Sequence, residues 1–327
     1  MTDQPRVVKT RIGPADHVFR GLSRTAGLLV LAIMLLVGLF LLYRGRQALA
    51  KAGLLKFLTT ETWEPDSYNF GIAAVLTGTV LIAVVAVALA VPLATGTALY
   101  IAEYAPRRVR PTLISLVDLM AAVPSIVYGL WGAYLLQGKV IGLSRWLATW
   151  LGWIPVFKVD GYDAADPLSP MAVFTTSTFI AGIVVALMIT PIICSIMREV
   201  FSQAPAGERE GAYALGATRW GMVRTVVLPF AAGGMIGGTM LGLGRALGET
   251  IAVYLIISPV FTIQPHILQS GANSISALIA LRFGEATQFG MSALMAAGLA
   301  LFLMTLIVNF AASTIVARTR SGTASEA

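Results

Sequence analysis

Six long runs of apolar residues, separated by shorter polar stretches, dominate this chain. The runs cover residues 25–43, 71–101, 112–136, 171–197, 230–257 and 287–316. An α-helix of about 20 apolar residues crosses the hydrocarbon core of a bilayer, and each run is close to that length or longer. The pattern therefore predicts an all-α, multi-pass protein of the cell membrane with six transmembrane helices.

The first apolar run follows a basic N-terminal tail, as the core of a signal peptide does. Residues 48–50 (Ala-Leu-Ala) even mimic a cleavage site. Signal-peptide cores have roughly 7–15 apolar residues, whereas residues 25–43 are numerous enough to span a bilayer. We therefore expect a first helix that is retained in the mature protein.

An even number of crossings puts both termini on the same side of the membrane, and basic residues predict which side that is. Fourteen Lys and Arg residues lie in the two tails and the loops on their side, against eight in the opposite loops. Loops rich in Lys and Arg stay in the cytoplasm. We expect cytoplasmic termini and three regions: residues 1–70 with the first helix and an external loop, a core of residues 71–316, and a tail of residues 317–327.

Prolines and tryptophans refine this topology. Pro92 and Pro124 lie inside apolar runs, where a proline removes a helical hydrogen bond, and the Ser125 hydroxyl is placed to cover the freed carbonyl. In the external loop of residues 137–170, tryptophans recur at helical spacing, which predicts a helix lying in the membrane interface. We also expect an interfacial return before the second run, where Trp63 and Tyr68 lie.

The longest polar interruption in the second half of the chain covers residues 208–229. Gly216 divides it into two short predicted helices, because glycine readily adopts the positive φ that ends a helix. Gly211, Ala212 and Ala214 are small enough to let a partner surface approach the first helix closely. Pro229 marks the entry to the next apolar run. The stretch therefore predicts a docking loop on the cytoplasmic side.

The spacing in this loop resembles the EAA motif of ABC importer permeases. The residues on the register of that motif are Glu210, Ala212, Gly216, Val226, Leu228 and Pro229. Gly211 replaces the first alanine of the motif and Val226 its usual isoleucine. The resemblance implies a type I ABC importer permease fold. It also implies that residues 197–229 form the loop that sits in a groove of a separate ATPase subunit.

Further motifs resemble the phosphate-specific permeases of the Pst type. They lie at residues 90–93, 98–106, 123–129 and 243–250. The extended N-terminus and the long loop of residues 137–170 are most similar to the C-type subunit. This resemblance implies a heterodimer with a second related permease, two copies of an ATPase subunit, and an extracytoplasmic phosphate-binding protein that delivers inorganic phosphate.

Composition excludes several other functions. The chain is 57% hydrophobic and 12% charged, with a net charge of +7, but its basic residues are scattered at helix ends, so we expect no nucleic-acid partner. Gly138 and Lys139 lack the spacing of a Walker A loop. His17 and His266 have no neighbouring ligand residues, so we expect no metal site. The chain is predicted to be no enzyme and to hold no cofactor, with ATP hydrolysis in a partner subunit.

The fifth apolar run contains the strongest candidates for a substrate pathway. Arg245 lies near its middle, and Glu249 is four residues further on, where one continuous helix would place it on the same face. The hypothesis is that Arg245 transiently contacts the phosphate oxyanion while Glu249 weakens that hold. Thr250 and Ser125 are expected to add hydroxyls. The alternative is an ion pair that only holds helices together.

Other transport classes remain open at this point. Sulfate or molybdate is an alternative substrate within ABC importers. An ion-coupled secondary transporter also carries charges in its helices, but it does not need a loop of the EAA type. A membrane scaffold that binds partners and transports nothing is the third alternative.

Overall fold

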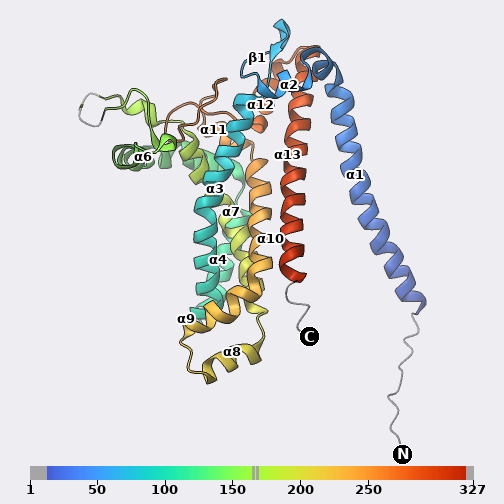
Figure 1. Cartoon of the computed structure of the whole chain (residues 1–327), viewed down its shortest axis with the longest axis vertical. Helices are drawn as coiled ribbons and strands as arrows, with labels where there is room; N and C mark the ends of the chain where they lie inside the picture. The colour runs from blue at the N-terminus through green and yellow to red at the C-terminus, as the bar shows by residue number, and fades with distance from the viewer. Residues whose placement is uncertain (1–12, 164–165, 167–168, 322–327) are drawn as a thin grey trace, which may run out of the picture.

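The structure, a computed structural model, describes residues 13–163, 166 and 169–321. It is a bundle of long helices with short elements at both ends (Figure 1). The α-helices are α1 (Pro14–Ala52), α2 (Leu54–Thr59), α3 (Ala73–Leu99), α4 (Arg110–Ala122), α5 (Ser125–Trp131), α6 (Gln137–Leu151), α7 (Thr178–Ser202), α8 (Ala206–Ala214), α9 (Arg219–Met222), α10 (Leu228–Leu247), α11 (Ile251–Ile256), α12 (Ile275–Arg282) and α13 (Gln288–Ser321).

Shorter elements connect these helices. Three π-helical segments are η2 (Tyr100–Tyr104), η3 (Gly132–Leu136) and η6 (Val223–Val227). The 3-10 helices are η1 (Pro65–Ser67), η4 (Pro155–Phe157), η5 (Met171–Phe174) and η7 (Phe283–Glu285). Two short antiparallel strands, β1 (Trp63–Glu64) and β2 (Asn69–Phe70), pair Trp63 with Phe70. The all-α prediction is therefore correct apart from this hairpin.

Within the described residues, six helical stretches are long and apolar enough to cross a membrane. They are Ala15–Ala52, Ala73–Tyr104, Ser125–Leu151, Thr178–Ser202, Arg219–Leu247 and Gln288–Ile315. The predicted number of six is confirmed. Their bounds differ from the apolar runs, because helices continue through π-helical segments and, for α1, through charged residues at both ends.

The bundle has two distinct ends. The start of α1, the end of α13 and the short helix α8 lie at one end, and β1, α2 and α12 lie at the other (Figure 1). We call these the α8 end and the β1 end. The arrangement agrees with six crossings, and the side of the membrane that each end faces stays a prediction.

The helices α3, α7 and α10 form the centre of the bundle, and glycines let them approach closely. A Cβ at Gly182 of α7 would lie 2.4 Å from Cγ1 of Val85 on α3. A Cβ at Gly242 of α10 would lie 2.5 Å from Cδ1 of Ile193 on α7. Helix association in a membrane depends on such close van der Waals contact, because lipid tails are as apolar as the side chains.

Helix α1 is much longer than the predicted residues 25–43. Only its second half packs closely on α13: a Cβ at Gly45 would lie 2.9 Å from the backbone nitrogen of Ala296. Ser292 of α13 accepts a hydrogen bond from the backbone N–H of Ala48 and donates one to the carbonyl of Arg44. The first half stands away from the other helices in Figure 1, and its apolar side chains are exposed.

The third predicted run is not one helix. Proline cannot donate a backbone hydrogen bond and disfavours helical geometry in the preceding residue, so α4 ends at Ala122 and α5 starts after Pro124. The prediction that the Ser125 hydroxyl covers a freed carbonyl is wrong. Tyr128 does this instead, with its hydroxyl donating to the carbonyl of Met120 at 2.9 Å.

Aromatic residues at the β1 end divide into exposed and buried groups. Trp146 and Trp150 on α6 are exposed, and α6, the second half of the candidate stretch Ser125–Leu151, lies beside the bundle across the direction of α3 (Figure 1). Its interfacial position stays a prediction. Trp63 was expected at the membrane interface, but it is only 8% exposed and makes an edge-on contact with Phe70. It therefore belongs to a small core beneath the hairpin.

Candidate functional site

The fifth apolar run contains a break in the helix at residues 248–250. Helix α10 ends at Leu247 and α11 begins at Ile251, so the predicted single helix is wrong. Gly248 follows the last turn of α10, and its N–H bonds to the carbonyl of Gly244 at 3.3 Å. A break inside a membrane protein needs partners for its free backbone groups, since no water is available there.

Glu249 supplies such partners at the centre of the break. Its side chain is buried, with the residue 8% exposed, and Oε1 accepts a hydrogen bond from the backbone N–H of Ala252 at 3.2 Å. Its carbonyl accepts a hydrogen bond from the Ser276 hydroxyl at 2.7 Å. Glu249 therefore caps α11 and joins the break to α12.

Arg245 does not pair with Glu249. The break ends the helix between the two residues, so they do not share one helical face, and no ion pair joins them. Arg245 lies in the last turn of α10, where a positive charge interacts favourably with the helix dipole. Its side chain is exposed, and its guanidinium has no hydrogen-bond partner among the described residues. It is therefore available to a ligand or a partner subunit.

The two predicted hydroxyl residues lie on neighbouring elements. Thr250 belongs to the break, and its hydroxyl donates to the carbonyl of Gly248 at 3.2 Å. Ser125 starts α5, which packs directly on α11, because a Cβ at Gly129 would lie 2.8 Å from the Cα of Ala252. Both side chains are partly exposed. The structure thus brings the elements that carry Ser125, Glu249 and Thr250 together.

A buried polar segment next to the break was missed by sequence reasoning, which treated residues 258–286 as a short polar return. Asn273 is buried, and its backbone carbonyl oxygen lies so close to Gly78 of α3 that a Cβ there would clash with it. Ser274 caps α12 by accepting a hydrogen bond from the N–H of Ala277. Thr79 of α3 accepts one from the N–H of Ile275 at 3.0 Å. The alternation of Asn and Ser with small apolar residues was the available signal.

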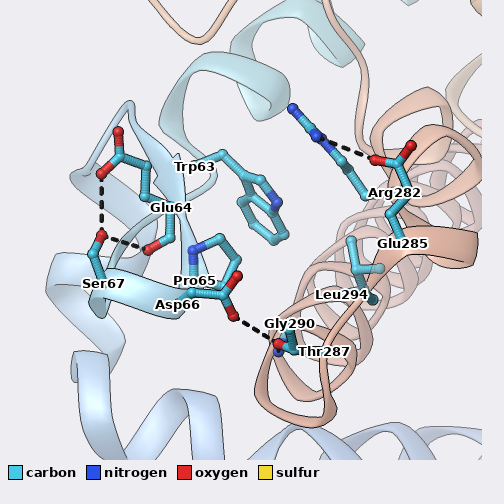
Figure 2. Close-up of a pocket in the computed structure, with 11 residues that line it drawn as sticks. Trp63, Glu64, Pro65, Asp66, Ser67, Arg282, Glu285, Thr287, Gly290 and Leu294 are labelled. Atoms are coloured by element: carbon cyan, nitrogen blue, oxygen red, sulfur yellow. Dashed lines mark hydrogen bonds and ion pairs between the residues drawn. The ribbon is translucent and has the colours of Figure 1, made fainter.

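A second polar feature lies at the β1 end, where a cavity of about 370 Å³ separates the hairpin from the start of α13 (Figure 2). Asp66 accepts a hydrogen bond from the Thr287 hydroxyl at 2.7 Å across this cavity. Arg282 lies 3.6 Å from Glu285 on the wall opposite the hairpin, and Trp63 lies on the hairpin side of the cavity (Figure 2). The hydrogen bond between Asp66 and Thr287 therefore ties the hairpin to the start of α13.

The same end carries a small electrostatic cluster in the loops. Asp160 lies 3.1 Å from Lys158 Nζ and 3.3 Å from His266 Nδ1. The hydrogen bond with Lys158 lowers the pKa of the Asp160 carboxyl below its ordinary value, although exposure to solvent opposes a strong effect. Among the described residues, no group of His, Cys, Asp and Glu has the arrangement of a metal site.

The predicted docking loop forms α8 and α9, joined through Gly216, whose φ is +84°. The helix pair and the positive φ are confirmed. However, α9 is not separate from the next membrane helix. Arg219–Leu247 is continuous, because the N–H of Leu228 bonds to the carbonyl of Val223 in a π-helical turn just before Pro229. Pro229 therefore does not start a new helix.

The surface of α8 is mostly open to solvent. Glu210 and Gly211 are exposed, and Leu215 at its end is 91% exposed. Ala212 was expected on the partner-facing surface, but it is half-buried and packs against the hydrophobic core. Leu228 likewise packs partly against the core, whereas Pro229 is exposed. Most of the surface of α8 is therefore free to contact a partner.

Comparison with known proteins gives the family. The model of the family described as "Binding-protein-dependent transport system inner membrane component" matches residues 90–321. The phosphate transport system permease protein PstC 2 of Mycobacterium tuberculosis (strain ATCC 25618 / H37Rv) is 38% identical over 319 residues, which cover 95% of this chain and 96% of that protein. PstC of Xylella fastidiosa (strain 9a5c) is 39% identical over 308 residues, covering 94% and 92%.

Solved structures show the same fold at low identity. A bacterial alginate ABC transporter, in complex with an alginate pentasaccharide-bound periplasmic protein, aligns with a TM-score of 0.58 and 17% identity, covering 92% of this chain and 96% of that one. The MetNI methionine ABC transporter in an inward-facing conformation aligns with a TM-score of 0.54 and 14% identity, covering 79% and 99%. The predicted importer permease fold is confirmed. Such permeases work with a separate ATPase and a binding protein. The chain therefore belongs to the family of inner membrane components of binding-protein-dependent transport systems, the permease subunits of ABC importers.

Proposed function

We propose that this permease conducts inorganic phosphate into the cell. The observation that carries the proposal is the identity of 36–39% to phosphate transport permeases over almost the whole chain. An ATP-driven import cycle also fits the open surface of α8, which a secondary transporter would not need. The matched relatives make phosphate a better candidate than sulfate or molybdate.

We infer that Arg245 is the residue that contacts the oxyanion. Its guanidinium is exposed at the end of α10 and has no carboxylate partner among the described residues, and guanidinium groups bind phosphate oxygens through paired hydrogen bonds. Glu249 holds the break that presents Arg245, rather than neutralising it. The hydroxyls of Thr250 and Ser125 are proposed as further groups along the pathway.

The assembly is proposed to contain a second related permease subunit, two copies of the ATPase subunit and an extracytoplasmic phosphate-binding protein. The α8 end is proposed to face the cytoplasm, in agreement with the excess of Lys and Arg there. The docking residues are Glu210 and Gly216 at the contact surface. Ala212 and Leu228, which pack against the core, support the loop from behind, and Pro229 is exposed beside it at the start of α10.

Cysteine labelling tests the orientation. Ala206→Cys at the α8 end should be protected from an impermeant thiol reagent added to intact cells, while Thr262→Cys in the loop before α12 should react. Cys194 is buried, so the unmodified protein serves as the control. Reaction at position 206 from outside would reverse the proposed topology.

Phosphate uptake tests the role of Arg245. Arg245→Gln should abolish ATP-dependent phosphate uptake while the ATPase still copurifies, and Arg245→Lys should retain a small part of it, since Lys keeps the charge without the paired geometry. Arg145→Gln makes the same change at an exposed arginine of α6 and should transport normally. Wild-type uptake by Arg245→Gln would place the pathway elsewhere.

A further inference from the structure

An ion pair connects the helix α8 to the end of α3. Arg209 Nη1 lies 3.0 Å from Glu103 Oε1 and donates a hydrogen bond to Oε2 at 3.4 Å. The Glu103 side chain is 6% exposed and that of Arg209 is 22% exposed. Arg209 also donates to the carbonyl of Phe201, a buried residue near the end of α7. One guanidinium therefore holds α8 against the ends of two packed helices.

The rest of α8 contributes little to this attachment. Arg209 and Ala212 are its residues that turn toward the protein, and the others are exposed. Because the alanine side chain is small, the ion pair is the principal polar connection between α8 and the bundle. Removing one partner of a largely shielded ion pair leaves an uncompensated charge and is strongly destabilising, so this contact favours one position of α8.

Two more arginines contact the same end of α3, the π-helical segment η2. The guanidinium of Arg219 on α9 lies 5.4 Å from the centre of the Tyr104 ring. Arg110 of α4 donates to the carbonyl of Ile101 at 2.8 Å and to that of Ala102. Side chains from α4, α8 and α9 thus converge on η2. Single π-helical turns within helices are frequent at functional positions.

Helix α3 leads from η2 to the break in the fifth crossing. It continues through Pro92 without interruption. One face of its central part, which includes Ala86, Ala90 and Ala94, is fully buried, and a close-packed interior transmits displacement rather than absorbing it. Near its other end, Thr79 accepts the hydrogen bond from Ile275, and the adjacent Ser276 donates to the carbonyl of Glu249. A contiguous series of contacts therefore joins α8 to the break.

We propose that α3 is a rigid strut that couples movement of α8 to the break at residues 248–250, with the Glu103–Arg209 ion pair as its joint. The proposal rests on the docking role proposed for α8. A displacement of α8 by the ATPase reaches η2 through the ion pair, and it reaches Glu249 through Thr79 and Ser276. Glu103 and Arg209 are positioning residues that contact neither phosphate nor ATP.

A double-mutant cycle in the reconstituted importer tests the joint. The variants are Glu103→Gln, Arg209→Gln and the double variant, and the quantity measured is phosphate imported per ATP hydrolysed by complexes that retain the ATPase. Each single variant should lower this ratio at least fivefold, and the double variant should be no lower than the worse single one, because both changes remove the same contact. Glu199→Gln, at an exposed acid in the last turns of α7, should leave the ratio unchanged.

An unchanged ratio in either single variant, or losses that multiply in the double variant, would overturn the proposal. If the Gln variants do not assemble, Tyr104→Leu decides, because it removes the Arg219 contact without leaving a buried charge. It should lower the ratio two- to threefold, and a wild-type ratio would overturn the role of η2. Failure of the wild-type complex to import phosphate would contradict the proposed substrate instead. In that case the same variants are compared by how strongly the binding protein stimulates their ATP hydrolysis.

Discussion

The two ends of α10 provide hydrogen-bond partners for their free backbone groups in different ways. At the α8 end, the chain passes Pro229 without a break, because a π-helical turn already pairs the Leu228 N–H with the Val223 carbonyl. At the other end, the helix stops, and the side chains of Glu249 and Ser276 bond to the buried backbone groups that the break leaves free. The first end is held by its own backbone, and the second depends on side chains from two elements. Substitutions at the break should therefore have the larger effects.

Among substitutions that test this backbone contrast, the largest effect is expected at Glu249. Glu249→Ala leaves the buried N–H of Ala252 without an acceptor, a loss of about 1–3 kcal/mol, and should lower phosphate uptake more than tenfold. Glu249→Gln keeps the Oε1 acceptor and should stay within about threefold of wild type. Uptake assays and thermal unfolding of the purified complex measure both effects. Equal activity in the two variants would mean that capping is not the role of this side chain.

The next effect is expected at Gly216. Its φ of +84° is unfavourable by roughly 1–2 kcal/mol for a residue with a Cβ, so Gly216→Val should reorient α8 and reduce ATPase copurification several-fold. Asparagine tolerates positive φ better, and Gly216→Asn should bind nearly normally. Since no atom lies within 4 Å of a Cβ built there, a loss in both variants would indicate direct contact with the partner rather than backbone strain.

A smaller effect is expected at Ser276. Ser276→Ala removes the hydrogen bond to the Glu249 carbonyl and should destabilise the break by about 1 kcal/mol, seen as a two- to fivefold loss of uptake. Ser313→Ala removes a similar hydroxyl from an exposed position on α13 and should have no effect. If both alanine variants behave alike, the contact between α12 and the break does not matter for transport.

The smallest effect is expected at Pro229. Pro229→Ala restores a backbone N–H in a helix that is already continuous, so stability should change by less than about 0.5 kcal/mol. Membrane insertion and uptake should be unchanged in a cell-based assay. A large loss would show that the π-helical turn requires the proline, which would remove the contrast between the two ends of α10.

The sequence predicted the number of crossings, because hydrophobic length determines it, but not the breaks inside them. It also located the loop around Gly216, because the conformation there is local to one glycine. The break at residues 248–250 was missed, since apolar residues continue on both sides of it and its partners, such as Ser276, are distant in sequence. The supposed pairing of Arg245 with Glu249 failed for the same reason. Spacing predicts side-chain neighbours only while one helix continues.

The inward side of α8 could not be predicted either. Glu103 and Arg209 are far apart in the sequence, and each lies in a polar stretch where charged residues are usually solvated. Nothing local indicates that their side chains are shielded. The EAA register identified the residues around Arg209, but not which of them turn toward the bundle.

Substrate competition in proteoliposomes tests the central claim most directly. The complete complex, with its binding protein outside and ATP inside, should accumulate radiolabelled phosphate, and a hundredfold excess of sulfate or molybdate should leave the rate unchanged. Accumulation should stop when ATP is omitted. Strong inhibition by sulfate or molybdate, or undiminished uptake without ATP, would contradict the assignment of this chain as a permease for ATP-driven phosphate import.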